Sequence, residues 1–444
     1  PLSSSNISPP SRRGFFPAGG VQWPIKSALI AASDWIMCQR TPQRPGEGDM
    51  HAQLIEQAQA LKARTVDLRR RIHRHPELGL DLPRTREAVL EALAGLELDI
   101  ALSETTSGIV ATLHGARPGP TVLLRGDMDA LPLVEETGLE FASAVAGRMH
   151  ACGHDAHTAM LVSAVHLLND HRDEFAGSVR FMFQPGEEGP GGAEPMLAEG
   201  LLAAGGPPLA AFALHVAPEL PPGVIGCRSG PILAGADTVA ARILGHGGHG
   251  SMPHNALDPI PAACEVVQAI QTLVTRRFNV FDPVVATVGR IQAGTTSNVI
   301  PETAELDITL RSLSPASRQR LASGVERLLR EIPAAHGLQV EFSLNTGYPP
   351  TVNHASGAAA VARAARDLFG ENGYLELAAP WMGAEDFSLV LERYPGAFAF
   401  IGAAPSGDGP HAPCHSNHMM IDEQALPAGV AMYALLALQA LAEA

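Results

Sequence analysis

The stretch Thr121-Val-Leu-Leu-Arg-Gly-Asp-Met-Asp-Ala-Leu-Pro132 is a short apolar run that ends in two acids. The run predicts a buried strand over residues 121–125, because a continuous apolar segment bounded by turn residues is typical of a strand covered on both faces. Asp127 and Asp129 are two residues apart, so both side chains face the same side of an extended segment. An Asp-rich turn is the alternative, but Met128 and Leu131 favour burial of these acids.

Further apolar runs show the same pattern and alternate with predicted helices. The helices cover residues 50–74, which end before His75-Pro76, and 85–94; the other strands cover 108–113, 179–184 and 209–215. Apolar strands that alternate with helices indicate an α/β fold with a mainly parallel, buried sheet. Polar side chains follow the carboxyl ends of these strands, where open α/β sheets place their sites.

The pattern changes after Gly235. The predicted order becomes β-α-β-β-α-β, with segments at 237–244, 258–277, 284–292, 304–312, 315–336 and 339–344. This order is that of a ferredoxin-like unit. We therefore expect an inserted domain at residues 233–346, within a catalytic domain formed by residues 50–232 and 347–444.

Residues 1–49 differ from the rest of the chain. They are rich in Ser, Pro, Gly and Arg, and their one apolar patch, 27–36, lacks the flanks of a secretory signal. Met50 opens an amphipathic pattern. We expect residues 1–49 to be unstructured or a non-native extension, with Met50 as the natural start.

Composition narrows the class of protein. The chain has 444 residues, of which 46% are hydrophobic and 17% charged, as expected for a globular enzyme. A net charge of −15, without a Lys/Arg stripe, argues against a nucleic-acid partner. Five scattered cysteines without CxxC pairs indicate a reducing compartment, which we take to be the cytoplasm. We saw no apolar run near the roughly 20 residues of a membrane span.

The densest group of metal-binding side chain types is His150-Ala-Cys-Gly-His-Asp-Ala-His157. Thiolate, imidazole and carboxylate hold divalent metals such as zinc, manganese, cobalt and nickel. Cys152 and His154 are two residues apart and can converge on one ion, whereas His157 is expected to support them from the following helix. A His-rich surface loop is the alternative.

Three other segments supply further candidate ligands. Glu187 and Glu188 follow a buried strand, where one carboxylate can bind metal while the other accepts a proton from water. His215 ends another apolar strand. Near the C-terminus His415 and His418 compete, Cys414 is a further candidate, and spacing alone does not choose among them. A surface acid pair and a structural histidine are the alternatives.

These motifs, and others along residues 54–440, resemble the amidohydrolase branch of the M20 metallopeptidase family. They include Ile72-His-Arg-His-Pro-Glu-Leu-Gly79, Gln184-Pro-Gly-Glu-Glu188, Gly248-His-Gly-Ser-Met-Pro-His254, Ser297-Asn-Val-Ile-Pro301 and Met382-Gly-Ala-Glu-Asp-Phe-Ser388. The branch usually has His-Ser/Asn-Pro where this chain has His415-Ser-Asn417.

The resemblance implies a role for each candidate residue. It implies a zinc-peptidase-like catalytic domain with an inserted lid and dimerisation domain, and two divalent ions, Zn²⁺ or Mn²⁺, with Co²⁺ and Ni²⁺ as further candidates. The implied site residues are metal ligands Cys152, His154, Glu188, His215 and His415; general base Glu187 with supporting acid Asp129; His249, which polarises the scissile carbonyl from a neighbouring subunit; and Asn298 with Arg311, which bind the substrate carboxylate.

The activity that the resemblance implies is hydrolysis of N-acyl or N-aroyl amino acids to a carboxylic acid and a free amino acid, by a homodimer or a larger homo-oligomer. Two other functions stay open. One is a dipeptidase or carboxypeptidase of the same family, since the same water attacks either amide. The other is a non-catalytic protein that binds metal or amino acids.

Overall fold

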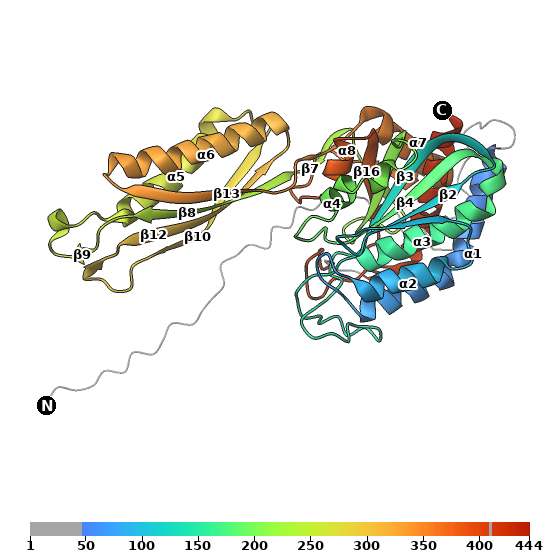
Figure 1. Cartoon of the computed structure of the whole chain (residues 1–444), viewed down its shortest axis with the longest axis horizontal. Coiled ribbons are helices and arrows are strands. Elements are labelled where there is room, and N and C mark those ends of the chain that lie inside the picture. Colours follow the sequence, from blue (N-terminus) through green and yellow to red (C-terminus); the bar gives the residue numbers. More distant parts are fainter. Residues whose placement is uncertain (1–46, 408–410) are drawn as a thin grey trace. The chain divides into compact units, whose positions relative to one another are not determined.

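The computed structural model describes residues 47–407 and 411–444. The expectations for residues 1–49 therefore fall almost wholly outside the described part. Its largest sheet has eight strands in the order β1-β2-β4-β3-β5-β16-β6-β15 (Figure 1). These strands are β1 (Asp99–Leu102), β2 (Ile109–His114), β3 (Arg117–Asp127), β4 (Ala176–Gln184), β5 (Ala210–Ala217), β6 (Ile225–Cys227), β15 (Tyr374–Glu376) and β16 (Gly396–Gly402).

This sheet is mixed, so the expectation of a mainly parallel sheet is correct only for its centre. β4, β3, β5 and β16 run parallel to one another, whereas β1 and β2 form an antiparallel edge and β16 pairs antiparallel with β6. β1 and β2 join through only six residues, and so short a connection permits an antiparallel pair but not a parallel crossover.

Helices and short apolar segments cover both faces of the eight-stranded sheet. Successive strand residues point to opposite faces, so Val122 and Leu124 belong to one buried cluster while Leu123 belongs to the other. The first cluster includes α1 (Glu47–Arg74), α2 (Pro83–Leu93), α3 (His154–Asp170), α7 (Ala355–Phe369) and α9 (Leu426–Ala442); the second includes α4 (Ala193–Ala198) and α8 (Ser388–Leu391).

A second, four-stranded sheet has its own hydrophobic core. Its strands lie in the order β10-β12-β8-β13, all antiparallel, with α5 and α6 side by side against them (Figure 1). The elements are β8 (Gly235–Leu244), α5 (Pro259–Arg277), β10 (Val284–Ala293), β12 (Thr303–Ser312), α6 (Pro315–Ala335) and β13 (Gln339–Thr346). Asp258 and Ser314 cap the two helices through backbone N–H groups. The predicted β-α-β-β-α-β order is confirmed, whereas the domain boundaries and the lid role stay predictions.

Two small two-stranded sheets complete the strand pairing. β7 (Gly230–Leu233) pairs with β14 (Thr351–Asn353), and β9 (Gly248–His249) pairs with β11 (Val299–Ile300). Single 3₁₀ turns occur at Arg172–Glu174, Leu201–Ala203, Pro253–Asn255, Glu371–Gly373 and Glu423–Ala425.

One helix is long and apolar enough to cross a membrane, so the expectation that the chain has no such apolar run was wrong. Residues Glu423–Ala442 have a mean hydropathy of 1.7 and are long enough to cross a membrane, but 78% of the apolar window is buried inside the protein. α9 packs against α1, α3 and α7, so it is a core helix. A helix that is buried on all sides has apolar residues around its whole circumference.

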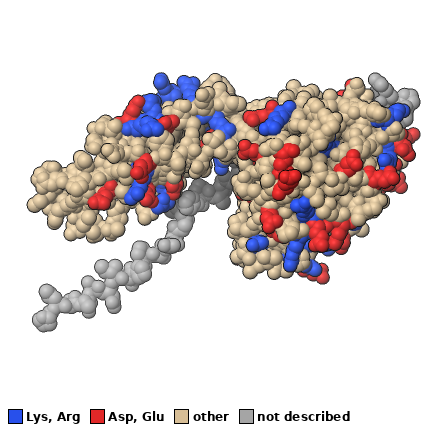
Figure 2. All heavy atoms as spheres, in the orientation of Figure 1, with Lys and Arg blue, Asp and Glu red and all other residues tan. Residues whose placement is uncertain are grey.

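Charged side chains of both signs are interspersed on the visible face of the described residues, without a continuous basic stripe there (Figure 2). This mixture of signs agrees with a chain that has 31 Lys and Arg and 46 Asp and Glu residues.

Candidate metal centre

The candidate site lies where three neighbouring parallel strands end. β3 ends at Asp127, which is in register with Gln184 at the end of β4, and His215 lies near the end of β5 on the other side of β3. The carboxyl ends of parallel strands meet at one edge of the sheet. The predicted residues that follow these strands are therefore brought together as expected.

A glycine turn aims the thiol and the first imidazole at this edge. Gly153 has φ +86°, and a Cβ built on it would lie 2.3 Å from a methyl carbon of Val216. Only glycine suits that backbone conformation without strain. The turn ends the segment that carries Cys152 and starts α3 at His154, so the two side chains face one space.

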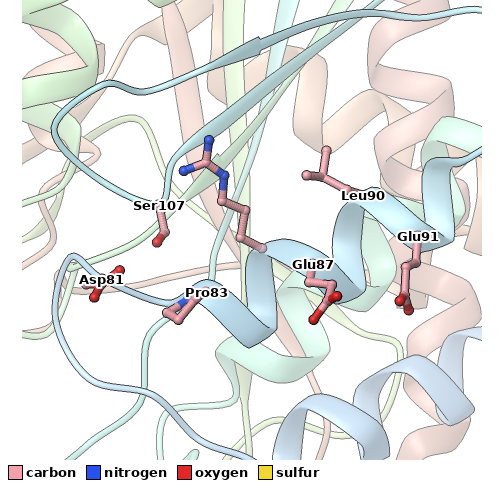
Figure 3. A pocket seen from close by; sticks show the side chains of 7 residues that line it. Asp81, Pro83, Glu87, Leu90, Glu91 and Ser107 are labelled. Carbon is pink, nitrogen blue, oxygen red and sulfur yellow. The ribbon is translucent and has the colours of Figure 1, made fainter.

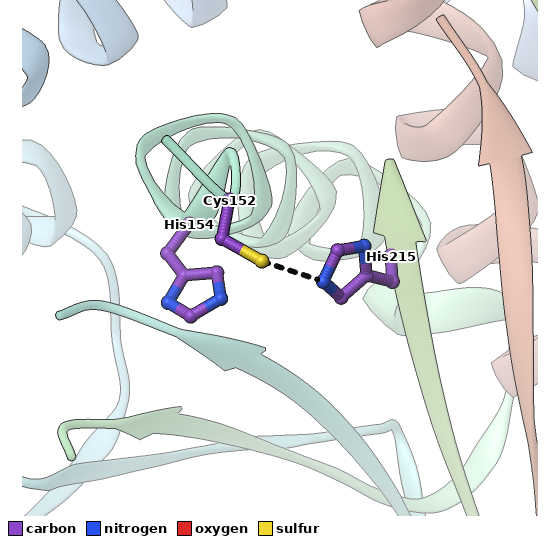
Figure 4. A group of neighbouring side chains, drawn as sticks. All are labelled: Cys152, His154 and His215. Carbon is purple, nitrogen blue, oxygen red and sulfur yellow. Dashed lines mark hydrogen bonds between the residues drawn. The ribbon is translucent and has the colours of Figure 1, made fainter. Parts of the chain in front are cut away.

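Five predicted ligand side chains converge in two groups that share one sulfur. One ligand atom each from Cys152, His154 and His215 lie within 4.8 Å of one another, and so do atoms of Cys152, Glu188 and His415. Cys152 Sγ lies 3.3 Å from His215 Nε2, and Figure 4 shows the three side chains of the first group turned toward one another. A thiolate in this position is suited to bridging two metal ions.

The donor atoms that face this space fit a metal. Among the buried side-chain atoms of the described residues, His154 Nε2 has no hydrogen-bond partner. Buried polar atoms are nearly always satisfied, so an unpartnered imidazole nitrogen of His154 beside the sulfur of Cys152 fits a bound cation. Sulfur, imidazole nitrogen and carboxylate oxygen are the donor set of Zn²⁺ and similar divalent ions.

Hydrogen bonds also set the tautomers of two imidazoles. His215 Nδ1 donates to the carbonyl oxygen of Val216 at 2.7 Å, which leaves Nε2 with its lone pair toward Cys152. Burial, and next the neighbouring His157, lower the pKa of His215, so it stays a neutral donor. His157 Nε2 instead accepts from the backbone N–H of Val216 at 2.8 Å, and its Nδ1 lies 2.5 Å from Asp127. His157 therefore lies beside the candidate ligands, and its supporting role stays a prediction.

Asp129 holds the glutamate segment in place. Its two carboxylate oxygens accept from the backbone N–H groups of Glu187 and Glu188, at 2.9 and 3.0 Å. Oδ1 also lies 3.5 Å from His154 Nδ1. One buried carboxylate thus positions the candidate base, one candidate ligand glutamate and one candidate ligand histidine.

The two adjacent glutamates have different further neighbours. Glu188 Oε1 lies 3.2 Å from His415 Nε2, whereas a carboxylate oxygen of Glu187 lies within 4.8 Å of the carboxylates of Glu385 and Asp386. Burial, and next the neighbouring Glu385 and Glu188 carboxylates, raise the pKa of Glu187. A carboxylate with elevated proton affinity beside a metal site is suited to accepting a proton from water.

The structure separates the two C-terminal histidines. The backbone N–H of His415 donates to the carbonyl oxygen of Ala151 at 2.7 Å, and His415 adopts φ +69°. This left-handed turn directs the ring of His415 toward Glu188. His418 instead lies against Glu136, with Nδ1 3.0 Å from its carbonyl oxygen and Nε2 3.3 Å from its carboxylate.

A buried polar network under the site was not anticipated. Arg125 contacts Gln184, Asp127, Glu385 and Asp386, and its guanidinium lies 2.7 and 3.3 Å from the two oxygens of Glu385. Asp386 also accepts from Gln184 and from the backbone of Ala193. The only signal in the sequence was the motif at residues 382–388, whose acids stand among residues that predict a loop.

Tyr348 was also missed. Its hydroxyl donates to the carbonyl oxygens of Glu187 at 2.9 Å and Gly189 at 3.2 Å. Tyr348 follows β13, and its own carbonyl oxygen accepts from Ala236 at the start of β8. The loop that carries both glutamates is thus tied to the residues at the base of the four-stranded sheet.

Three predicted residues lie in the region of the four-stranded sheet. His249 in β9 pairs with Val299, and Gly250 donates to the carbonyl oxygen of Asn298. Arg311 pairs with Ala236 near one end of β12, whereas Asn298 precedes the opposite end of that strand. The eight residue-to-residue steps from Thr303 to Arg311 alone span about 27 Å, so Asn298 and Arg311 do not form a pair within one chain. Because β12 is extended between them, their expected roles in binding a substrate carboxylate stay predictions.

A surface hollow lies elsewhere on the catalytic part of the chain. Its volume is about 370 Å³ and it is lined by α2 and its surroundings, including Asp81, Arg86, Glu87 and Ser107 (Figure 3). It contains none of the predicted site residues, so we assign it no role in the chemistry.

Comparison with known proteins agrees with this geometry. Residues 123–439 match the model of peptidase family M20/M25/M40. The chain is 36% identical over 379 residues to the N-acetylcysteine deacetylase of Bacillus subtilis, with 85% of this chain and 97% of that protein covered. It is also 36% identical over 379 residues to thermostable carboxypeptidase 1 of Saccharolobus solfataricus, covering 84% and 94%.

A solved structure shares the fold. The crystal structure of the Bacillus subtilis YXEP protein, described as a dinuclear metal binding peptidase from the M20 family, matches with a TM-score of 0.75 and 34% identity, covering 87% of this chain and 99% of that one. The match of more than half of the chain to the family model, together with these relatives, shows that the chain belongs to peptidase family M20/M25/M40.

Proposed function

We propose that this protein is a metal-dependent amidohydrolase that cleaves N-acyl or N-aroyl amino acids into a carboxylic acid and a free amino acid. The observation that carries the proposal is the convergence of two candidate ligand groups on Cys152, with the carboxylate of Glu187 beside them. The similarity to an N-acetylcysteine deacetylase supports the choice of an N-acyl amino acid as substrate.

The residues that would hold the metal divide into two sets with a shared thiolate. Cys152, His154 and His215 would hold one divalent ion, and Cys152, Glu188 and His415 the other. When bound, such ions supply Lewis acidity that lowers the pKa of water toward neutrality. We propose Zn²⁺ or Mn²⁺, with Co²⁺ and Ni²⁺ as further candidates.

Glu187 would move the protons of the reaction. Its carboxylate accepts a proton from the attacking water and then delivers it to the leaving amine nitrogen. Asp129 holds the backbone of Glu187 during both transfers. We further propose that His249 polarises the scissile carbonyl and that Asn298 and Arg311 recognise the substrate carboxylate. A residue of these three that one chain cannot bring to its own site would come from the neighbouring subunit of a homo-oligomer. Arginine suits that task because its planar fork matches a carboxylate.

Substitution of Glu187 tests the proposal directly. Glu187→Gln keeps the shape of the side chain but removes the proton acceptor, so we expect turnover to fall about 10²–10⁴-fold with the metal content unchanged. The matched control is Glu56→Gln, an exposed residue of α1. Activity of Glu187→Gln close to that of the wild type would show that Glu187 is not the general base.

A substrate panel separates the remaining alternatives. Metal-free protein reconstituted with each divalent ion is assayed on N-acetyl and N-benzoyl amino acids and on free dipeptides. Preference for dipeptides would favour the peptidase alternative, which the similarity to a carboxypeptidase also supports. Bound metal without hydrolysis of any amide would favour a binding protein.

We also propose a cytoplasmic location. Cys152, Cys227, Cys264 and Cys414, which are the cysteines in the described part, are all free, and free thiols are typical of a reducing compartment. Fractionation of source cells with an antibody against the chain checks this proposal.

A further inference from the structure

Two cysteines far apart in the sequence lie beside one another at the candidate metal centre. The backbone N–H of His415 donates to the carbonyl oxygen of Ala151 at 2.7 Å, which places Cys414 alongside Cys152. The ligand atoms of Cys152 and His415, the residue next to Cys414, lie within 4.8 Å of each other, and the Cys414 side chain interacts with that of Cys152. The other two described cysteines lie elsewhere: Cys227 contacts Phe398 and Asn353, and Cys264 is exposed on α5.

The two thiols differ in their relation to the ligand atoms. Cys152 belongs to both groups of converging ligands, whereas Cys414 belongs to none of the groups found among the described residues. Cys152 is buried and Cys414 is only partly buried. Cys414 is therefore placed to react with Cys152 rather than to bind the metal itself.

We propose that Cys152 and Cys414 form an oxidisable pair, which a peroxide converts into a disulfide that excludes metal from the centre. The formation of the disulfide stands on the proximity of the two thiols alone. The exclusion of metal rests on the function proposed above, because it requires Cys152 to be the shared ligand.

The reaction balances with a peroxide as the two-electron oxidant. The Cys414 thiol, the more accessible of the two, loses its proton and its sulfur attacks a peroxide oxygen; the O–O bond breaks, a sulfenic acid forms, and the leaving hydroxide or alkoxide takes up that proton as water or an alcohol. The Cys152 thiol then loses its proton and its sulfur attacks the Cys414 sulfur; the S–S bond forms, the S–O bond breaks, and the leaving hydroxide takes up that proton as water. Both sulfurs are oxidised by one electron each, and the peroxide is reduced.

The local backbone permits this bond. A disulfide needs its two Cα atoms within about 7 Å, and residues 414 and 415 lie in a turn outside any helix or strand. A shift of this turn breaks no helix or sheet hydrogen bond. The same shift moves His415, a ligand of the second group, so oxidation would affect both groups of donors.

The experiment treats the full chain, free of metal, with hydrogen peroxide. We expect intact-mass measurement to show the loss of two hydrogen atoms, and peptide mapping without reductant to show a Cys152–Cys414 link that dithiothreitol reverses. Metal at about 100 times its Kd leaves about one hundredth of the site free, so we expect the link to form about 100-fold more slowly. The oxidised chain should bind no metal until it is reduced.

Two variants provide the controls. Cys414→Ser should form no link and should keep its metal-binding capacity through a mild peroxide treatment, whereas the matched control Cys264→Ser should behave as the wild type. Over-oxidation of Cys152 without a link, a link to Cys227 instead, or equal loss of metal binding in Cys414→Ser would overturn the proposal. If the untreated chain binds no metal, the proposed function fails, and the link itself is still decided by the mass measurement.

Discussion

Asp129 gives the sharpest test of how the candidate centre is built. It is buried, with 1% of its surface exposed, and accepts the backbone N–H groups of Glu187 and Glu188. Asp129→Ala leaves both donors without an acceptor. A buried donor without a partner costs about 1–3 kcal/mol, so we expect the free energy of unfolding to fall by about 2–6 kcal/mol, toward the lower end if water enters the space.

The same substitution should weaken the binding of metal. Asp129 Oδ1 lies 3.5 Å from His154 Nδ1 and helps to orient that ring. Loss of a carboxylate that supports a ligand histidine typically lowers metal affinity about 10–100-fold. Asp129→Asn keeps one acceptor oxygen, so its effects on stability and on affinity should lie between those of the wild type and alanine.

Urea unfolding of the metal-free protein measures the stability, and competition with a chromophoric chelator measures the affinity. The control is Asp81→Ala, an exposed aspartate whose loss should change the unfolding free energy by no more than about 0.5 kcal/mol. If Asp129→Ala matches this control in stability and the wild type in metal affinity, the reasoning about the supporting carboxylate is refuted.

Three further perturbations follow from contacts outside the ligand set. Burial disfavours a charged His73, but Asp155 and then Glu135 outweigh it and raise the pKa of His73 to about 9. Protonated His73 therefore stabilises the fold by up to about 3 kcal/mol below pH 6.5, and this contribution disappears as the pH rises through about 9. The free energy of unfolding measured from pH 6 to 10 should fall with that slope, and His73→Gln should flatten the slope. A Cβ on Gly192 would lie 1.6 Å from the carbonyl oxygen of Pro185, so Gly192→Ala should displace the glutamate loop and lower the metal content, measured by elemental analysis. The control Gly289→Ala should leave the metal content unchanged, since the nearest atom to that Cβ is 4.0 Å away. Arg125→Met leaves Glu385, Asp386 and Asp127 without their buried cation and should lower the unfolding free energy by about 3–5 kcal/mol. The control is Arg290→Met, which removes an exposed ion pair. A smaller loss of unfolding free energy after Arg125→Met than after Arg290→Met would contradict a stabilising role for the buried arginine.

Most of the element pattern could be predicted because it depends on short-range chemistry. Each strand predicted from an apolar run is present, and the β-α-β-β-α-β order of residues 235–346 is confirmed. Apolar runs of this kind indicate which segments are buried and whether the apolar residues repeat with the period of a strand or of a helix. Both are local properties of the chain. The same pattern does not report strand direction, so the antiparallel direction of β2 was not predicted. The short strands β1 and β6 were not predicted at all.

The ligand types were also visible in the sequence, since few functions other than metal binding place Cys, His and Glu at successive strand ends. The choice between His415 and His418 was not, because it depends on one turn at His415 with φ +69°. The contact of Arg125 with Glu385 joins residues 260 positions apart, and no spacing rule links them.

The sequence by itself therefore determined most of the longer elements, and which candidate ligand side chains stand near the ends of the central strands. Only the tertiary structure decided which side chains meet: His415 with Glu188, Arg125 with Glu385, Tyr348 with Glu187, and Cys414 with Cys152. The physical reason is that backbone preference acts over a few residues, whereas each of these contacts is set by how the sheet and the connecting loops pack together.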